Sequence, residues 1–132
     1  MSDTDPNAGW DFPIEHRDHA FVLHVKGEVL RSIDDPALRA GFLLQLQQEL
    51  EALIADTDHP HIVASFDDAR YINSGILGMM VQVHKWAKAK NGRLNLAGLD
   101  PNVSKVVQMM RLDKMLNVYP TVEEAVADFG QS

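Results

Sequence analysis

The chain has 132 residues, 45% hydrophobic and 23% charged, which is the size and composition of one ordinary globular domain. A net charge of −7, with 12 basic residues scattered among 19 acidic ones, argues against nucleic-acid binding, which needs clustered lysine and arginine. The absence of cysteine excludes disulfide and thiol chemistry, and no apolar run approaches the roughly 18 residues of a membrane span. We therefore expect a cytoplasmic protein whose partner presents a basic protein surface.

Five segments have the alternating or short apolar pattern of β-strands. A polar hairpin turn at residues 16–19 separates the first two, and Gly27 ends the second. The third follows a break at His59-Pro60, and the fourth follows an Asn91-Gly92 turn. The expected strands cover residues 11–17, 20–26, 61–66, 93–97 and 116–119.

Four segments have apolar residues at helical spacing. Asp35-Pro36 and Asp100-Pro101 each combine a cap with a proline in the first turn, and Thr121 forms a capping box with Glu124. The alternation predicts an α/β fold, a small mixed sheet of about five strands flanked by four helices. We expect one domain over residues 10–130 after a flexible tail over 1–9. The expected helices cover residues 37–55, 74–90, the segment from 101, and 122–129.

The segment from Tyr71 to Gly78 places Ser74 where the second helix begins. The first amides of a helix lack intrahelical partners, and the helix dipole adds positive charge there. A phosphorylated serine would bring about −1.5 to −2 charges to that position, which is the physical basis of a switch. The alternative is that Ser74, or Asn73 before it, only caps the helix.

Several local patterns point to one known family. Gly27-Glu28 follows the second strand, and the run from Ile62 to Ser74 leads from the third strand to the serine. With further matches at 96–101, 112–114, 118–119 and 123–125, the chain resembles a STAS domain, the fold of bacterial anti-sigma factor antagonists. The resemblance covers about residues 10–130.

The resemblance implies a function for Ser74. In switching members of the family, a partner kinase that doubles as the anti-sigma factor phosphorylates the aligned serine, and phosphorylation stops the protein from binding that kinase. Glu28, Asn73, Ser74 and Gly75 are then expected to contact the partner. The chain departs from the family motif in four places, because Leu30 and Asn73 replace acidic residues, Gly75-Ile76 replaces Ser-Gly, and Ser65 replaces a strand-end Asp. Asn73 removes a negative charge beside a phosphate and would make phosphorylation electrostatically easier.

The helix after Ser74 has a wide apolar arc. Projection at about 100° per residue puts Met79 and Trp86 at its edge, with His84 inside it as a hydrogen-bonded core histidine. The excess width is explained either by core packing or by an exposed patch for a partner, since Trp and Met are enriched in interfaces. We name Met79 and Trp86 as candidate partner contacts.

Other chemistry finds little support in the residues. His59-Pro60-His61 has no cysteine nearby, and its carboxylate neighbours Asp56 and Asp58 lie in a turn, so we expect no metal. No cofactor motif is present. Asp67-Asp68 reads as a solvated turn rather than a catalytic pair. We expect a protein that is not an enzyme, a monomer or weak dimer whose partner is an anti-sigma factor that is also a serine-protein kinase. A non-phosphorylated STAS scaffold or small-ligand module is the alternative, and a small hydrolase or transferase is a distant third.

Overall fold

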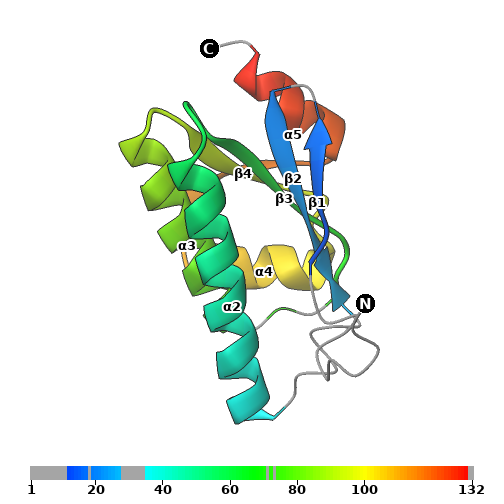
Figure 1. The fold of residues 1–132 in the computed structure, drawn as a ribbon. Coiled ribbons are helices and arrows are strands. Elements are labelled where there is room, and N and C mark those ends of the chain that lie inside the picture. The colour runs from blue at the N-terminus through cyan, green and yellow to red at the C-terminus, as the bar shows by residue number, and fades with distance from the viewer. Residues whose placement is uncertain (1–11, 18, 28–34, 71, 73, 131–132) are drawn as a thin grey trace.

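The computed structural model describes residues 12–17, 19–27, 35–70, 72 and 74–130. Five strands form one mixed sheet in the order β1-β2-β3-β4-β5 (Figure 1). β1 pairs antiparallel with β2, and the remaining neighbours are parallel. The strands are β1 (Ile14–Arg17), β2 (Ala20–Lys26), β3 (His61–Asp68), β4 (Arg93–Ala97) and β5 (Asn117–Tyr119).

The helices lie on both faces of this sheet (Figure 1). α2, α3 and α4 pack on one face, and α5 covers the other. A short 3-10 helix, η1, connects α4 to β5. The prediction of an α/β fold with a five-strand mixed sheet and four helices is confirmed. The helical bounds are α2 (Pro36–Ala55), α3 (Ser74–Ala89), α4 (Pro101–Met109), η1 (Leu112–Lys114) and α5 (Val122–Phe129).

Three helices begin at the capping residues that the sequence indicates. The Asp35 carboxylate accepts from the backbone N–H of Ala37 at 2.7 Å, and a proline occupies the first turn of α2. The Asp100 carboxylate accepts from the Asn102 N–H at 2.8 Å at the start of α4. Thr121 Oγ1 accepts from the Glu124 N–H at 3.1 Å and caps α5. Each cap satisfies an amide that would otherwise lack a partner.

The larger core lies between the sheet and α2, α3 and α4. Within it, the His84 ring is buried and its Nδ1 accepts from the Leu94 N–H at 3.2 Å, as predicted for a core histidine. Burial lowers the pKa of His84, with Lys88 and Arg93 acting in the same direction, so the ring stays neutral at neutral pH. The wide apolar arc predicted for α3 is buried, with His84 inside it. The buried residues of this helix are Ile76, Leu77, Met79, Met80, Val83, His84 and Ala87.

Three strand boundaries differ from the prediction, the smallest difference being that β5 begins at Asn117 rather than at residue 116. β1 begins at Ile14 rather than at residue 11, because Pro13 has no N–H for the ladder, and its carbonyl instead accepts from the His24 N–H at 2.9 Å. Phe12 precedes the strand and packs edge-on against Phe42 in the core. β3 continues to Asp68, where it still pairs with Lys26.

Candidate functional site

The site is assembled where the parallel strands β2 and β3 end. Lys26 pairs with Asp68, so the two strands leave the sheet side by side. Gly27 is buried here, and a Cβ at its position would lie 2.6 Å from the Asp68 carbonyl oxygen. A side chain does not fit between these two backbones, so glycine is required. Glu28 follows directly along the chain but lies outside the described residues.

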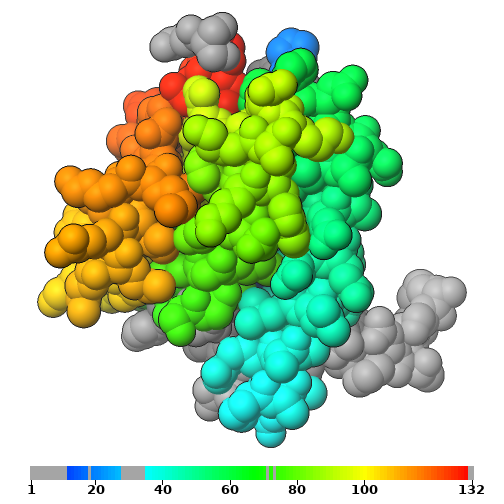
Figure 2. Space-filling view, turned by 90° about the vertical axis from the view of Figure 1, so that its left-hand side faces the viewer, coloured from blue at the N-terminus to red at the C-terminus, as the bar shows by residue number. Residues whose placement is uncertain are grey.

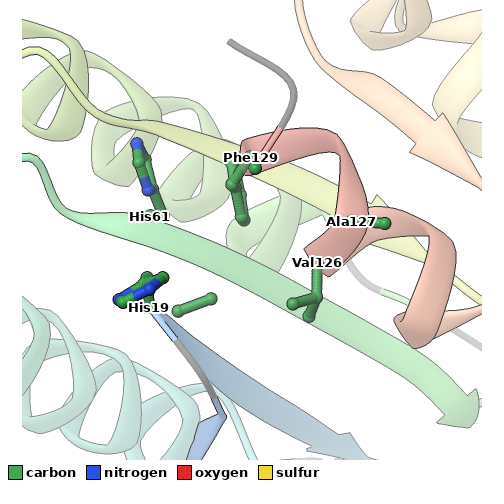
Figure 3. A pocket seen from close by; sticks show the side chains of 7 residues that line it. His19, His61, Val126, Ala127 and Phe129 are labelled. Carbon is green, nitrogen blue, oxygen red and sulfur yellow. The ribbon is translucent and has the colours of Figure 1, made fainter.

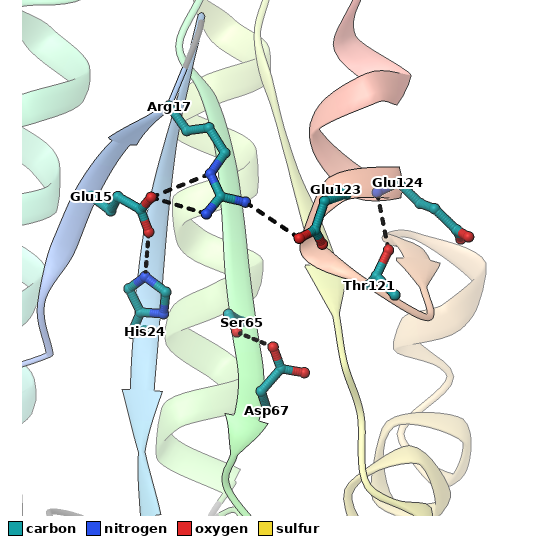
Figure 4. A network of polar contacts seen from close by, with 8 residues as sticks. All are labelled: Glu15, Arg17, His24, Ser65, Asp67, Thr121, Glu123 and Glu124. Atoms are coloured by element: carbon teal, nitrogen blue, oxygen red, sulfur yellow. Dashed lines mark hydrogen bonds and ion pairs between the residues drawn. The ribbon is translucent and has the colours of Figure 1, made fainter.

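β4 ends at the same edge of the sheet, and the residue after it lies close to the end of β3. Gly98 adopts a φ of +68°, a conformation that favours glycine, and a Cβ there would lie 1.9 Å from Asp67 Oδ1. The Gly98 N–H donates to the Tyr119 carbonyl at 3.1 Å. Ser65 Oγ donates to Asp67 Oδ2 at 3.3 Å, as Figure 4 shows. The end of β3 is therefore held between its two neighbouring strands.

A short loop leads from the end of β3 to α3 and is anchored twice. Ala69 is buried and its N–H donates to the Phe66 carbonyl at 3.0 Å, while Ile72 packs against the larger core. α3 begins at Ser74, the position that the sequence predicts. Ser74 and Gly75 are exposed, whereas the next two residues of the helix are fully buried. The fold fixes the start of α3 and leaves the serine hydroxyl accessible to solvent.

The electrostatics at this position favour an anion. The first turn of α3 contains no acidic residue, and the sequence from Ala69 to Leu99 contains no aspartate or glutamate at all. The positive end of the α3 dipole and its first amides lie at Ser74. A negatively charged group on the serine would meet that partial charge without a neighbouring carboxylate on the same helix.

The candidate partner contacts on α3 separate into two kinds. Met79 is 7% exposed and belongs to the core, so the expectation that it lies on an exposed flank is wrong. The helix is rotated so that its wide arc is used for packing against both the sheet and α2. Trp86 is half-buried and packs against the edge of the same core. Asn73 lies outside the described residues.

A cavity of about 380 Å³ lies at the opposite edge of the sheet, where β2 and β3 begin (Figure 3). His61 and Phe129 stack there with ring centroids 4.5 Å apart. Burial lowers the pKa of His61, and the Arg93 charge lowers it further, so the ring is neutral at neutral pH. The cavity is remote from Ser74 and does not support a small-ligand site at the start of α3.

Sequence reasoning missed Asp67 and Gly98 as parts of this edge. The signal that was available is a glycine immediately after a buried strand, which indicates a close backbone approach. Asp67 was read as a solvated turn, and its side chain is exposed, but its position against Gly98 depends on the pairing of β3 with β4.

Comparison with known proteins identifies the family of this chain. The model of the STAS domain family matches residues 11–125, which confirms the resemblance inferred from the sequence. The chain is 20% identical over 115 residues to the anti-sigma F factor antagonist of Paenibacillus polymyxa, covering 87% of this chain and 91% of that protein. None of the described helices has the length and apolar character that crossing a membrane demands.

Solved structures share the fold. An anti-sigma-factor antagonist (STAS) domain protein from Planctomyces limnophilus superposes with a TM-score of 0.76 at 16% identity, covering 91% of this chain and 98% of that one. The anti-sigma factor antagonist SpoIIAA in its unphosphorylated form gives 0.71 at 20% identity, with 92% and 97% covered. The phosphorylated form of SpoIIAA, from Bacillus, gives 0.63 at 18% identity, with 89% and 98% covered.

Proposed function

The chain belongs to the STAS domain, anti-sigma factor antagonist family, which is non-enzymatic, and from that premise we propose that it is a cytoplasmic partner-switching regulator. Its partner is an anti-sigma factor that is also a serine-protein kinase, and the partner phosphorylates Ser74. The observation that carries the proposal is the exposed Ser74 hydroxyl at the first residue of α3. The structures of SpoIIAA in both phosphorylation states support a charge-controlled member of this fold.

Phosphorylation at Ser74 changes charge without requiring the core to move. The dianion sits at the positive end of α3, where helix amides and the dipole favour it. Ile76 and Leu77 hold the first turn of the helix in the core, so the added group projects toward solvent. A partner that covers the helix start would have to desolvate that charge, which is costly unless it supplies its own cation.

The proposed binding surface follows from the same geometry. A phosphate blocks a partner only if the partner covers it, so the contact includes Gly75 and the loop that precedes Ser74. Gly27 lies against the end of β3, and Glu28 follows it in the sequence, outside the described residues. We include Glu28, Asn73 and the half-buried Trp86 in the proposed surface. The buried Met79 is not included.

Two substitutions at Ser74 test the proposal. Incubation with the kinase-like partner and ATP should add one phosphate group to the wild type and none to Ser74→Ala, measured by intact mass. In a pull-down with that partner, Ser74→Ala should bind like the wild type, and Ser74→Asp should bind at least about tenfold more weakly, or ~1.4 kcal/mol. The half-buried Ser104 on α4 provides a matched control, since Ser104→Ala should still be phosphorylated. If the pull-down retains the wild type, Ser74→Ala and Ser74→Asp equally, Ser74 is not a charge switch.

A further inference from the structure

Basic and acidic residues are segregated along the sequence, so the basic residues are less evenly scattered than the sequence analysis states. Residues 69–122 hold eight of the twelve lysines and arginines but only two of the nineteen acidic residues. This stretch has a formal charge of +6, whereas the rest of the chain has −13. It contains α3, α4, η1 and β5, so an acidic protein carries one basic region.

The same region exposes most of the large apolar side chains that the described residues leave in solvent. Met109, Met110, Met115 and Val118 are 74%, 41%, 48% and 40% exposed, and we call these four residues the methionine surface. α4 ends at Met109, and Met110, its C-cap, is exposed. α4, η1 and β5, yellow to orange in Figure 2, lie beside α3.

Basic side chains border the methionine surface. Lys105 precedes Met109 by four residues on α4 and shares its side of the helix. Arg111 and Lys114 lie between the methionines, and all three cations are exposed. Within the described part of the chain, none of the three has an ion-pair partner. The exposed Asp113 is the one acidic residue of this segment, so the three cations leave it with a net positive charge. Flexible thioethers beside these cations form a surface suited to an acidic protein with apolar side chains.

We propose that the methionine surface binds an acidic amphipathic helix of another protein. Met109 lies in α4 and Val118 in β5, while Met110 and Met115 are the C-caps of α4 and η1. These side chains suit packing against a helix, whereas β5 offers only three residues for strand addition. A two-fold contact of this surface with that of a second copy would bring two positively charged surfaces together, and their like charges oppose it. The proposal concerns elements other than the Ser74 loop and does not depend on phosphorylation.

Other anionic partners fit the surface less well. Nucleic acids are bound by basic grooves with aromatic stacking platforms, and the exposed apolar side chains here are methionine and valine. Membrane-surface helices carry Trp, Phe or Leu on their apolar side, whereas the exposed large apolar residue of α4 is Met109. An acidic helix satisfies both the charge and the apolar requirement.

The test uses the full chain with isotope-labelled methionine methyl groups followed by NMR. The probe is a synthetic helical peptide with leucines along one side and glutamates elsewhere. We expect saturable shifts of the Met109, Met110 and Met115 methyl signals, with a Kd below about 1 mM. The core residues Met79 and Met80 should not shift and serve as internal references. A peptide of the same composition with scrambled leucines should bind at least about tenfold more weakly.

Charge reversal separates a specific surface from general attraction. The pair Arg111→Glu and Lys114→Glu should weaken peptide binding at least about tenfold, or ~1.4 kcal/mol. The matched pair Lys85→Glu and Lys88→Glu makes the same charge change on the exposed side of α3 and should weaken it less than about twofold. Unchanged Met79 and Met80 signals verify that each variant is folded.

Several outcomes overturn the proposal. If the methyl shifts do not saturate at a peptide concentration of about 1 mM, or if the scrambled peptide binds equally well, the amphipathic helix is excluded as the occupant. Equal weakening by the two charge-reversal pairs shows general attraction without a site. If the Met109 and Met115 signals shift when the protein is concentrated without peptide, the surface is assigned to a second copy. Stronger binding of a single-stranded oligonucleotide or of anionic vesicles would assign it to nucleic acid or lipid.

Discussion

At the start of α5, Thr121 caps the helix, and Glu123 and Glu124 place two carboxylates in the first turn (Figure 4). At the start of α3, the exposed Ser74 is followed by Gly75 and by no acidic residue in the first turn. Both helices have a positive dipole end there, but only α5 compensates it with charged side chains of its own. The charges of α5 serve the fold, whereas the first turn of α3 has no acidic residue at the position where we propose that a phosphate is added.

The far end of α5 extends this contrast. Arg93 donates to the Asp128 carboxylate, and the Asn95 side-chain amide donates to the Asp128 carboxylate and the Ala125 carbonyl. Glu123 lies 4.0 Å from Arg17 of β1. Asp128 and Glu123 of α5 thus lie near cations or amides of the sheet. On α3, the exposed residues beyond Ser74 include Lys85 and Lys88, for which the described residues provide no ion pair.

The first prediction asks whether α3 and α5 differ in partner binding, and it carries the largest effect. Trp86→Ala should weaken binding of the anti-sigma factor kinase at least about tenfold, or ~1.4 kcal/mol, because desolvated tryptophans dominate interfaces. It should also lower the free energy of unfolding by about 2 kcal/mol, less than the ~3–5 kcal/mol of a fully buried aromatic, because Trp86 is half-buried. Binding titrations and urea melts measure the two effects.

The matched variant for Trp86 lies on α5. Val126 is also half-buried and packs against the smaller core, so Val126→Ala should lower stability while leaving partner binding unchanged. If Trp86→Ala behaved in the same way, with stability lost and binding intact, the tryptophan would be a packing residue only, and α3 and α5 would not differ in this respect.

The second prediction concerns the charge that fixes α5. Burial would raise the pKa of Asp128, but hydrogen bonds from Arg93, Tyr119 and Asn95 outweigh it and lower the pKa below the ordinary 3.8. A lowered folded-state pKa means that the carboxylate stabilises the protein above about pH 4 and that this stability is lost as the pH falls further. Asp128→Asn should therefore cost about 1–2 kcal/mol at pH 7 and much less near pH 3.

Urea melts at the two pH values test this linkage. Asp58→Asn, at an exposed position in the turn after α2, is the control and should change stability by less than about 0.5 kcal/mol at either pH. A cost of Asp128→Asn that is the same at both pH values would mean that packing or shape, and not the ionised carboxylate, holds the end of α5.

Local chemistry explains why most of the fold was predictable. Asp35, Asp100 and Thr121 act on amides two or three residues away, so their helix starts follow from sequence alone. α3 begins at Ser74, where the sequence placed the helix start. The rotation of α3 was not predictable, because it depends on simultaneous contact with the sheet and with α2, and that contact buries Met79. The exposed methionines likewise depend on where α4 ends.

The last and smallest prediction converts the start of α3 into one that resembles α5. Gly75→Glu places a carboxylate in the first turn, where the dipole should stabilise it by about 0.3–1 kcal/mol. Gly75→Gln adds a side chain of the same shape without charge, so it separates that gain from the higher helix propensity that both variants share. Urea melts of the two variants should differ by this amount, and the difference should shrink in high salt as the charge is screened. The same carboxylate would repel a phosphate on Ser74, so the kinase should phosphorylate Gly75→Glu more slowly than Gly75→Gln. Equal stability and equal phosphorylation of the two variants would show that the start of α3 is already compensated, and the contrast with α5 would fail.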